Sequence, residues 1–337
     1  MNLAHAMPAS WYHDPAVYAR ECETIFGREW LYLGPASWFR VSGDYAAEAI
    51  VGKPIFVVRD RDGGLAGFAN VCRHRAGPIL PDGQGRCDVL RCRYHGWTYA
   101  LDGALKAMPN FEAPTDFDKA AHGLYPIRVA EWRGLVFVNL DRDAGPLADG
   151  LGDLVGAAAG HPLERYEFAE RVTFSLAFNW KNYIDNYMEA LHIPLLHPGL
   201  ARQVSLDLYR VEPGHHVCIH RAPVPAGATY AGLWLWRWPN LTVGTYEGGL
   251  NATRIQPLGP RAMSLEIDFY FAPSLDEALR RERMHWTRQV VEEDFGICES
   301  VQRNLESGFY ETGPLSPRHE NGVAYFHDRV RRALGAR

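Results

Sequence analysis

The sequence predicts an α+β protein in which a small antiparallel β domain is followed by a larger domain, an antiparallel sheet packed by helices. Between about residues 36 and 145, short strand-like runs such as IFVVRD and LVFVNL are separated by Asp-Gly turns. Strand-like segments return between about 204 and 272, and apolar residues at helical spacing flank them, near 178–192 and 275–306. A chain of 337 residues is long enough to bury the cores of two such domains.

The first part of the chain is predicted to be helical. Residues 9–34 offer Ser10 or Asp14 as a helix cap and carry apolar side chains at helical spacing. A Gly- and Ala-rich stretch, LADGLGDLVGAAAG, leads into the second α+β region. We therefore expect a helical segment at 1–35 that packs on the larger domain, the β domain at 36–145, and the larger domain at 146–337.

Composition and charge exclude several classes of protein. Lys and Arg number 35 against 40 Asp and Glu, so the net charge is −5 and no basic field for nucleic acid or an anionic membrane is present. The N-terminus lacks the pattern of a secretory signal, and no apolar run reaches the ~20 residues of a membrane span. Six cysteines are few for this length and suggest a reducing compartment. We expect a cytoplasmic protein with neither nucleic acid nor membrane as a partner.

Two short Cys/His patterns lie close together on predicted loops of the β domain. They are Cys72-x-His74 and, after seventeen intervening residues, Cys92-x-x-His95. A Cys2His2 zinc site is the alternative, but zinc fingers pair Cys with Cys and His with His, whereas each pattern here is mixed. A [2Fe–2S] cluster with two thiolates on one iron and two imidazoles on the other needs this mixture, which is the Rieske arrangement. Cys87 has no histidine just downstream, and we expect it to be a buried apolar thiol.

A second metal-binding pattern lies in the predicted helical segment near 178–192 and just beyond it. His192 and His197 are five residues apart with Pro194 between them, so a helix must break there before both imidazoles can face one metal. Two His and one carboxylate hold the iron of non-haem oxygenases and leave positions open for oxygen and substrate. The candidate acids are Asp185 and Glu189 nearby, and Asp294 with its neighbours Glu292 and Glu293 on a later predicted helix.

With both patterns in view, nearly the whole chain resembles the catalytic α-subunit of the Rieske non-haem iron oxygenases. The motifs NVCRHR and CRYHGWTY, NWKNYIDNYMEALHIPLLHPGL, WPNL with IQPLGP, and EEDFGICESVQ occur in that family's order. The resemblance implies a Rieske domain, a helix-grip (START-like) catalytic domain, and two cofactors, a [2Fe–2S] cluster and a mononuclear Fe(II). It implies Cys72, His74, Cys92 and His95 as cluster ligands, and His192, His197 and Asp294 as iron ligands.

The resemblance also implies the partners and two further site residues. Glu189 occupies the position of the acid that bridges an iron ligand and a cluster histidine of the neighbouring subunit, and Asn186 matches an asparagine close to the iron. Electrons are expected from NAD(P)H through a separate ferredoxin and/or flavin reductase. Because the two centres of one chain are far apart in this family, we expect a homotrimer that acts on a small-molecule substrate and O2.

The sequence gives less information about the substrate. Trp234, Trp236 and Trp238 alternate along a predicted strand, near Tyr230, and would share one face. Such a face suits a quaternary ammonium group. The segment EALHIPLLHPGL, with Glu189 in the bridging position, resembles the choline-, betaine- and carnitine-oxidising branch of the family. Packing of the sheet against a helix, or a flat aromatic substrate, explains the stripe equally well. Candidate partners for a substrate carboxylate are Arg202, Arg210, Arg221 and Arg254.

Three functions are compatible with these residues. The leading one is a terminal oxygenase that performs monooxygenation, hydroxylation or oxidative N-demethylation of a small substrate, with quaternary ammonium compounds favoured. A cis-dihydroxylating dioxygenase of aromatic rings would use the same metal ligands and differ in its pocket. A Rieske electron-transfer protein without oxygenase activity would have lost the second metal, and the presence of all three candidate ligands argues against it.

Overall fold

The computed structural model describes residues 3–336 and divides into two compact units. One unit is Gly27–Leu147, which contains the predicted β domain. The other joins the described residues up to Phe26 with those from Ala148 onward. In the part of the chain that the structure describes, no helix combines the length and the apolar character that a membrane crossing needs.

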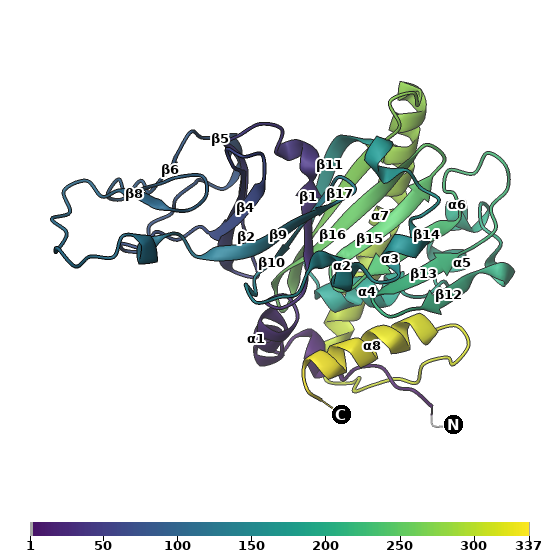
Figure 1. Cartoon of the computed structure of the whole chain (residues 1–337). Helices are drawn as coiled ribbons and strands as arrows, with labels where there is room; N and C mark the ends of the chain where they lie inside the picture. The colour runs from purple at the N-terminus through teal and green to yellow at the C-terminus, as the bar shows by residue number, and fades with distance from the viewer. Residues whose placement is uncertain (1–2, 337) are drawn as a thin grey trace. The chain divides into compact units, whose positions relative to one another are not determined.

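The Gly27–Leu147 unit is a β structure (Figure 1). A seven-stranded antiparallel sheet has the order β1-β10-β9-β4-β3-β2-β5, and a separate three-stranded sheet has the order β6-β7-β8. The strands of this unit are β1 (Leu31–Pro35), β2 (Asp44–Ile50), β3 (Lys53–Arg59), β4 (Leu65–Ala69), β5 (Gly83–Arg86), β6 (Leu90–Arg91), β7 (Thr98–Tyr99), β8 (Leu105–Ala107), β9 (Pro126–Trp132) and β10 (Leu135–Asn139). Two 3-10 turns, η2 (Ala36–Trp38) and η3 (Ala120–His122), complete it.

The helix predicted over residues 9–34 is shorter in the structure. After the 3-10 turn η1 (Ala9–Tyr12), helix α1 (Pro15–Thr24) begins at Asp14, whose side chain accepts a hydrogen bond from the Ala16 backbone N–H at 2.8 Å. The apolar run that follows forms strand β1, in which all five residues are buried. A run buried on both faces satisfies its backbone in a sheet as readily as in a helix, and periodicity does not distinguish the two. The compact β unit therefore starts at Gly27 and not at residue 36.

The second unit is built on one antiparallel sheet with the order β11-β17-β16-β15-β14-β13-β12. Apart from β11, which pairs with β17, the strands follow one another as a meander. The strands are β11 (Glu167–Leu176), β12 (Arg210–Pro213), β13 (Val217–Arg221), β14 (Leu233–Arg237), β15 (Leu241–Tyr246), β16 (Gly249–Gly259) and β17 (Ala262–Phe271). The predicted strands between about 204 and 272 are therefore present.

Helix α7 (Glu277–Leu305) runs along this sheet (Figure 1). Its apolar residues Met284, Val290 and Val291 pack on the sheet core that contains Ile267 and Phe269. The other helices and turns are α2 (Leu147–Leu151), α3 (Leu154–Ala157), η4 (Leu163–Arg165), α4 (Trp180–Tyr187), α5 (Ile193–Leu196), α6 (Pro198–Ala201), η5 (Leu206–Leu208) and α8 (Asn321–Ala333). An antiparallel sheet packed by helices is the predicted architecture, and the helix predicted over 275–306 is confirmed.

A buried ion pair ties the N-terminal segment to α4. Lys181 Nζ lies 2.6 Å from Glu21 Oε1, both side chains are 0% exposed, and the indole N–H of Trp180 donates to Glu21 Oε2 at 2.9 Å. Burial lowers the pKa of Lys181, and the Glu21 carboxylate opposes that effect. The N-terminal segment thus packs on the helix that precedes the histidine pair.

We expect Lys181→Met to lower the free energy of unfolding by about 3–5 kcal/mol, because it leaves the Glu21 charge buried without a cation. The double variant Glu21→Gln/Lys181→Met should recover most of that loss. Arg281→Met, which breaks the exposed Arg281–Glu277 pair on α7, is the matched control and should cost less than about 1 kcal/mol. Urea unfolding followed by tryptophan fluorescence measures all three, and equal losses for the buried and exposed pairs would contradict the prediction.

Candidate metal centres and substrate cavity

Two loops of the β unit present the first set of metal-ligating side chains with the same backbone turn. In each, the cysteine N–H donates to the carbonyl five residues on, at 2.9 Å, and the cysteine carbonyl accepts from the N–H four residues on, at 3.0 Å. Ala76 and Gly96 occupy the equivalent fourth positions, and both have positive φ, 57° and 75°. The two loops are therefore matched frames that start at Cys72 and Cys92.

The side chains on these loops fit a [2Fe–2S] cluster. Cys72 and Cys92 are buried, whereas His74 and His95 are partly exposed and their ring centroids lie 4.6 Å apart. His74 Nδ1 is buried with no hydrogen-bond partner in the described structure, as expected of an atom reserved for a metal. A Cβ on Gly77 would lie 2.8 Å from Cys92 Sγ, so only glycine leaves room beside that sulfur.

Neighbouring groups support this assignment of sulfurs. The Tyr99 hydroxyl lies 3.3 Å from Cys72 Sγ and accepts a hydrogen bond from the Arg73 N–H. The ring of Trp97 stacks on His74 with centroids 4.9 Å apart. Cys87 is a partly buried thiol whose pKa burial raises to about 11, in keeping with its predicted apolar role.

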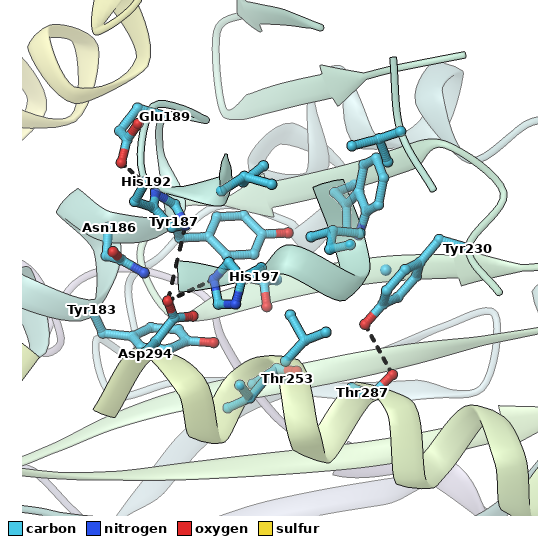
Figure 2. Close-up of a pocket in the computed structure, with 18 of the residues that line it drawn as sticks. Tyr183, Asn186, Tyr187, Glu189, His192, His197, Tyr230, Thr253, Thr287 and Asp294 are labelled. Atoms are coloured by element: carbon cyan, nitrogen blue, oxygen red, sulfur yellow. Dashed lines mark hydrogen bonds and ion pairs between the residues drawn. The ribbon is translucent and has the colours of Figure 1, made fainter. Parts of the chain in front are cut away.

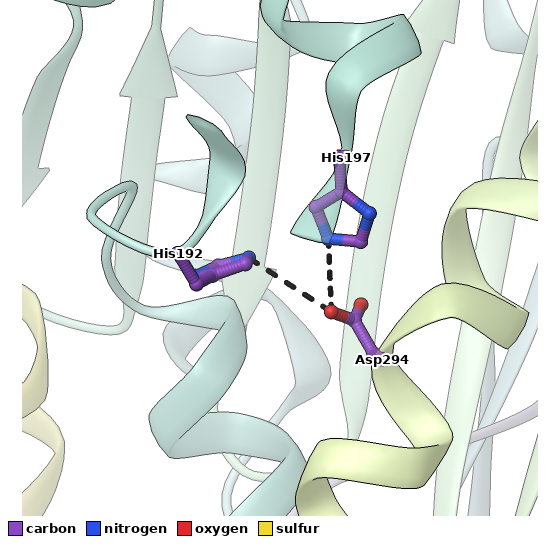
Figure 3. Close-up of side chains that lie close together, drawn as sticks. All are labelled: His192, His197 and Asp294. Atoms are coloured by element: carbon purple, nitrogen blue, oxygen red, sulfur yellow. Dashed lines mark ion pairs between the residues drawn. The ribbon is translucent and has the colours of Figure 1, made fainter. Parts of the chain in front are cut away.

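The second set of side chains comes together in the catalytic unit (Figure 3). Helix α4 ends at Tyr187, and the one-turn helix α5 places His192 just before its first residue and His197 just after its last. The break that Pro194 predicted is therefore present. Asp294 reaches the same point from α7.

The geometry of this triad suits one metal ion. Asp294 Oδ1 lies 2.9 Å from His197 Nε2 and 3.9 Å from His192 Nε2, and one ligand atom from each residue lies within 4.8 Å of the others. Metal bonds to nitrogen and oxygen are about 2.0–2.2 Å, so a single ion reaches all three with small adjustments. Of the described residues searched, these three form the only such group of His, Cys, Asp or Glu.

Two further carboxylates orient the triad histidines through their other ring nitrogens. Glu189 contacts His192 Nδ1 and also accepts from the Leu191 backbone N–H. Glu293 Oε2 lies 2.7 Å from His197 Nδ1. Such contacts fix the ring orientation and leave Nε2 directed at the metal position.

The other acid candidates lie elsewhere. Asp185 accepts from the Tyr12 hydroxyl at 2.5 Å and lies 2.7 Å from His327 Nε2, so it belongs to a separate buried network. Glu292 is exposed and pairs with Arg288 at 3.8 Å. Asn186, which the resemblance places close to the iron, lies beside the triad and lines the adjoining cavity (Figure 2).

A cavity of about 100 Å³ adjoins the triad (Figure 2). Its wall is mainly aromatic and aliphatic, with a group of neutral hydroxyl and amide side chains along one side. The described lining residues are Tyr183, Asn186, Tyr187, Glu189, His192, Ile193, His197, Leu200, Val204, Tyr209, Tyr230, Trp234, Thr242, Gly244, Asn251, Thr253, Thr287, Val290, Val291 and Asp294.

The predicted tryptophan cage is only partly present. Trp234 lines the cavity, and its ring centroid lies 5.3 Å from that of Tyr230, which also lines it. Trp236 and Trp238 are not among the lining residues, and a cage of all three tryptophans is wrong. Trp236 is fully buried, and its ring centroid lies 5.5 Å from that of Phe326 of α8 and 5.9 Å from that of Trp238. Helix α8 covers the part of the strand face on which they lie, so they belong to the core.

Sequence reasoning missed several residues of the wall. Tyr183 and Tyr187 are four residues apart on α4 and therefore face the same side as each other. Thr287 precedes Asp294 by seven residues, two helical turns, so it lies on the metal-facing side of α7. These spacings were detectable signals. Tyr209 precedes a short edge strand, and its spacing gave no such signal.

The two units thus present four Cys and His side chains in one and two His with a carboxylate in the other. Together, this fold and these sites define an iron-dependent oxygenase that contains its own iron–sulfur electron carrier. Residues 29–126 match the Rieske [2Fe-2S] domain, and residues 163–221 and 214–336 match the ring hydroxylating alpha subunit (catalytic domain). The chain belongs to this family of Rieske non-haem iron oxygenases and is a terminal oxygenase with a Rieske cluster and a mononuclear iron.

Named relatives act on quaternary ammonium compounds. The chloroplastic choline monooxygenase of Spinacia oleracea is 32% identical over 98% of this chain and 79% of its own length. The carnitine monooxygenase oxygenase subunit of Escherichia coli (strain K12) is 31% identical over 96% of this chain and 92% of its own length. The structure of the quaternary ammonium Rieske monooxygenase CntA with L-carnitine aligns with a TM-score of 0.86 and 28% identity, covering 98% of this chain and 96% of that one. Naphthalene 1,2-dioxygenase aligns with a TM-score of 0.81 over 98% and 92% but is 18% identical, which shows the fold alone. The predicted fold class and family are confirmed.

Proposed function

We propose that this oxygenase acts on a small quaternary ammonium compound, by monooxygenation, hydroxylation or oxidative N-demethylation. The observation that carries the proposal is the aromatic wall beside the metal triad. Five aromatic side chains line a cavity of about 100 Å³. The faces of aromatic rings attract quaternary ammonium cations through cation–π interactions. The relatives described as choline and carnitine monooxygenases support the same substrate class.

In this proposal each metal-ligating side chain has one role. Cys72, Cys92, His74 and His95 hold the cluster, and His192, His197 and Asp294 hold the iron. When bound, the iron supplies the dioxygen chemistry, in which one oxygen atom enters a substrate C–H bond and the other leaves as water with two electrons and two protons. The protein residues hold the substrate beside the triad, and bound substrate would displace water from the cavity.

Glu189 is proposed to link the two centres. It holds the His192 ring from the Nδ1 side and sits at the edge of the cavity, as a bridging acid requires. By the family's pattern its partner is a cluster histidine of a neighbouring subunit, in a homotrimer that receives electrons from NAD(P)H through a ferredoxin and/or flavin reductase. The solved structure of CntA is described in terms of inter-subunit electron transfer, which supports this arrangement.

The competing functions make different demands on the cavity. A polycyclic aromatic substrate needs a flat slot, and the tryptophan stripe that favoured such a slot is reduced to Trp234. An electron-transfer protein has no need of a triad with its ligand atoms within 4.8 Å of one another beside a lined cavity. No feature of the described cavity or triad specifically favours either alternative.

The test is coupled turnover by the iron-loaded protein with a reductase. We expect quaternary ammonium compounds to stimulate NADH and O2 consumption, with an oxygenated or N-demethylated product identified by mass spectrometry. Aromatic acids and hydrocarbons should stimulate neither. Diol or phenol formation from an aromatic, with no product from any quaternary ammonium compound, would transfer the protein to the ring-hydroxylating branch.

Trp234→Leu should raise KM for choline by about tenfold, because a desolvated cation–π contact contributes about 1–2 kcal/mol. The inhibition constant of the neutral isostere 3,3-dimethyl-1-butanol, used as a competing ligand, should change far less, because it makes no cation–π contact. Steady-state kinetics and competition measure the two effects. Equal losses for the charged and neutral compounds would show that Trp234 contributes only shape.

A further inference from the structure

The cavity has an uneven distribution of charge. Of the described residues that line it, none is a lysine or an arginine. Its charged groups are the carboxylates of Glu189 and Asp294, both at the metal end. The two carboxylates together offset the double charge of a ferrous ion, so the occupied site offers no surplus positive charge to a substrate anion.

The arginines that the sequence offered for a substrate carboxylate are engaged elsewhere or exposed. Arg254 is buried and pairs with Glu266 at 3.0 Å. Arg210 is exposed and donates to the Asp207 and Tyr209 carbonyl oxygens. Arg283, one turn before Thr287 on α7, donates to the Glu247 carbonyl oxygen. Arg202 and Arg221 are exposed as well.

A chain of neutral hydrogen-bonding groups meets the cavity away from the metal. Asn251 Nδ2 donates to the Tyr246 hydroxyl at 2.7 Å, and that hydroxyl lies 2.5 Å from Thr287 Oγ1. Thr287 Oγ1 in turn lies 3.1 Å from the Tyr230 hydroxyl, the contact marked in Figure 2. The hydroxyl of Thr253 donates to Asn251 Oδ1 at 3.3 Å, which fixes the orientation of the amide.

Either oxygen can donate in each of the two Thr287 contacts. Because the Asn251 amide nitrogen donates to Tyr246, we assign the direction that gives both of the next hydroxyls an acceptor within the chain: Tyr246 donates to Thr287, and Thr287 donates to Tyr230. The O–H of Tyr230 is left as a donor at the cavity wall. Burial raises the pKa of Tyr230 to about 12, so the phenol keeps this proton at neutral pH.

We propose that the cavity selects quaternary ammonium compounds that end in a neutral hydroxyl, such as choline, and rejects those that end in a carboxylate, such as glycine betaine or carnitine. The aromatic wall receives the cation and Tyr230 donates to the hydroxyl oxygen. A carboxylate would lose its hydration with only neutral donors as compensation and no cation. This inference rests on the proposed function. It distinguishes hydroxyl-bearing from carboxylate-bearing substrates, which sequence similarity does not, because choline and carnitine monooxygenases are nearly equally similar to this chain.

The test compares three compounds with the same trimethylammonium head on the iron-loaded enzyme with its reductase. They are choline, ethyltrimethylammonium, which lacks the hydroxyl, and glycine betaine, which replaces it with a carboxylate. We expect kcat/KM for choline to exceed that for ethyltrimethylammonium by about tenfold and that for betaine by about a hundredfold or more. Calorimetric binding of the same compounds should give the same order.

Two matched variants assign the effect to the hydroxyl chain. Tyr230→Phe should bring the choline-to-ethyltrimethylammonium ratio of kcat/KM close to one. Tyr187→Phe removes a hydroxyl from the same cavity, but that hydroxyl donates to the Leu235 carbonyl at 3.1 Å, so the ratio should be unchanged. Betaine or carnitine turned over as well as choline would overturn this inference and leave the proposed function standing. No coupled turnover with any quaternary ammonium compound would overturn both.

Discussion

Asp294→Ala is expected to lower the iron content from about three to about two atoms per chain and to reduce turnover by about a hundredfold or more. Among residues 3–336, Asp294 is the one carboxylate whose oxygen lies near both His192 Nε2 and His197 Nε2, so its loss leaves a two-ligand site. The [2Fe–2S] cluster is held by the other unit and should keep its absorbance and its two sulfides. Metal analysis, sulfide analysis and product formation measure these outcomes.

Glu292→Ala is the matched control for this substitution. Glu292 lies two residues away on the same helix but points to solvent beside Arg288. Its removal should leave both iron content and turnover unchanged. An Asp294→Ala protein that still binds three irons and turns over substrate would refute the ligand assignment.

Glu189→Gln should retain both metals and lose most turnover, by about 10- to 100-fold. The amide keeps the size of the side chain and a contact to His192, but it no longer carries the charge of a bridging acid. In a single-turnover experiment with the cluster reduced beforehand, cluster reoxidation should slow in parallel with product formation. Near-native coupled turnover in this variant would contradict the bridging role.

Glu293→Gln separates bridging from simple support of a ligand. Glu293 contacts His197 Nδ1 much as Glu189 contacts His192 Nδ1, but it is not at the family's bridging position. We expect Glu293→Gln to weaken iron binding and to regain turnover when iron is supplied in excess. Glu189→Gln should stay slow under the same conditions, because its defect lies in electron transfer and not in metal affinity.

The Cys and His ligands were predictable because short spacings decide them, whereas Asp294 was one of five candidate acids and only the family resemblance selected it. A Cys and a His within three residues on one loop, or two His around a proline, leave few arrangements for the side chains. Within each unit the structure brings its own set together: His74 beside His95 in one, and His192 beside His197 in the other. The strand pattern of both units was predictable for a similar reason, since turns and alternation are local. The matched backbone turns at Cys72 and Cys92 were not, because Ala76 adopts positive φ without a glycine to signal it.

The cavity wall was less predictable because tertiary packing decides it. Trp234 and Trp236 share a strand face, yet α8 covers one and the cavity reaches the other. Nothing in the alternation of the strand records where a helix about ninety residues later in the chain will lie. The end of the first helix was missed on similar grounds, since burial of β1 on both faces depends on strand neighbours distant in sequence.

Helix α7 contributes both Asp294 and Thr287, and this shared origin fixes the distance between the two residues. Seven residues at a rise of about 1.5 Å separate their Cα atoms by about 10.5 Å. That separation is rigid because it lies within one continuous helix and not across a loop. Thr287 contacts the Tyr230 hydroxyl, which we propose holds the far end of the substrate. In that proposal, helical register sets the distance from the metal to the residue that positions Tyr230, and we expect it to influence which carbon atom is oxidised. Moving the threonine by one turn, to the position of Val290 or Val291, would bring a hydroxyl closer to the metal and remove the present support of Tyr230, without replacing a metal ligand.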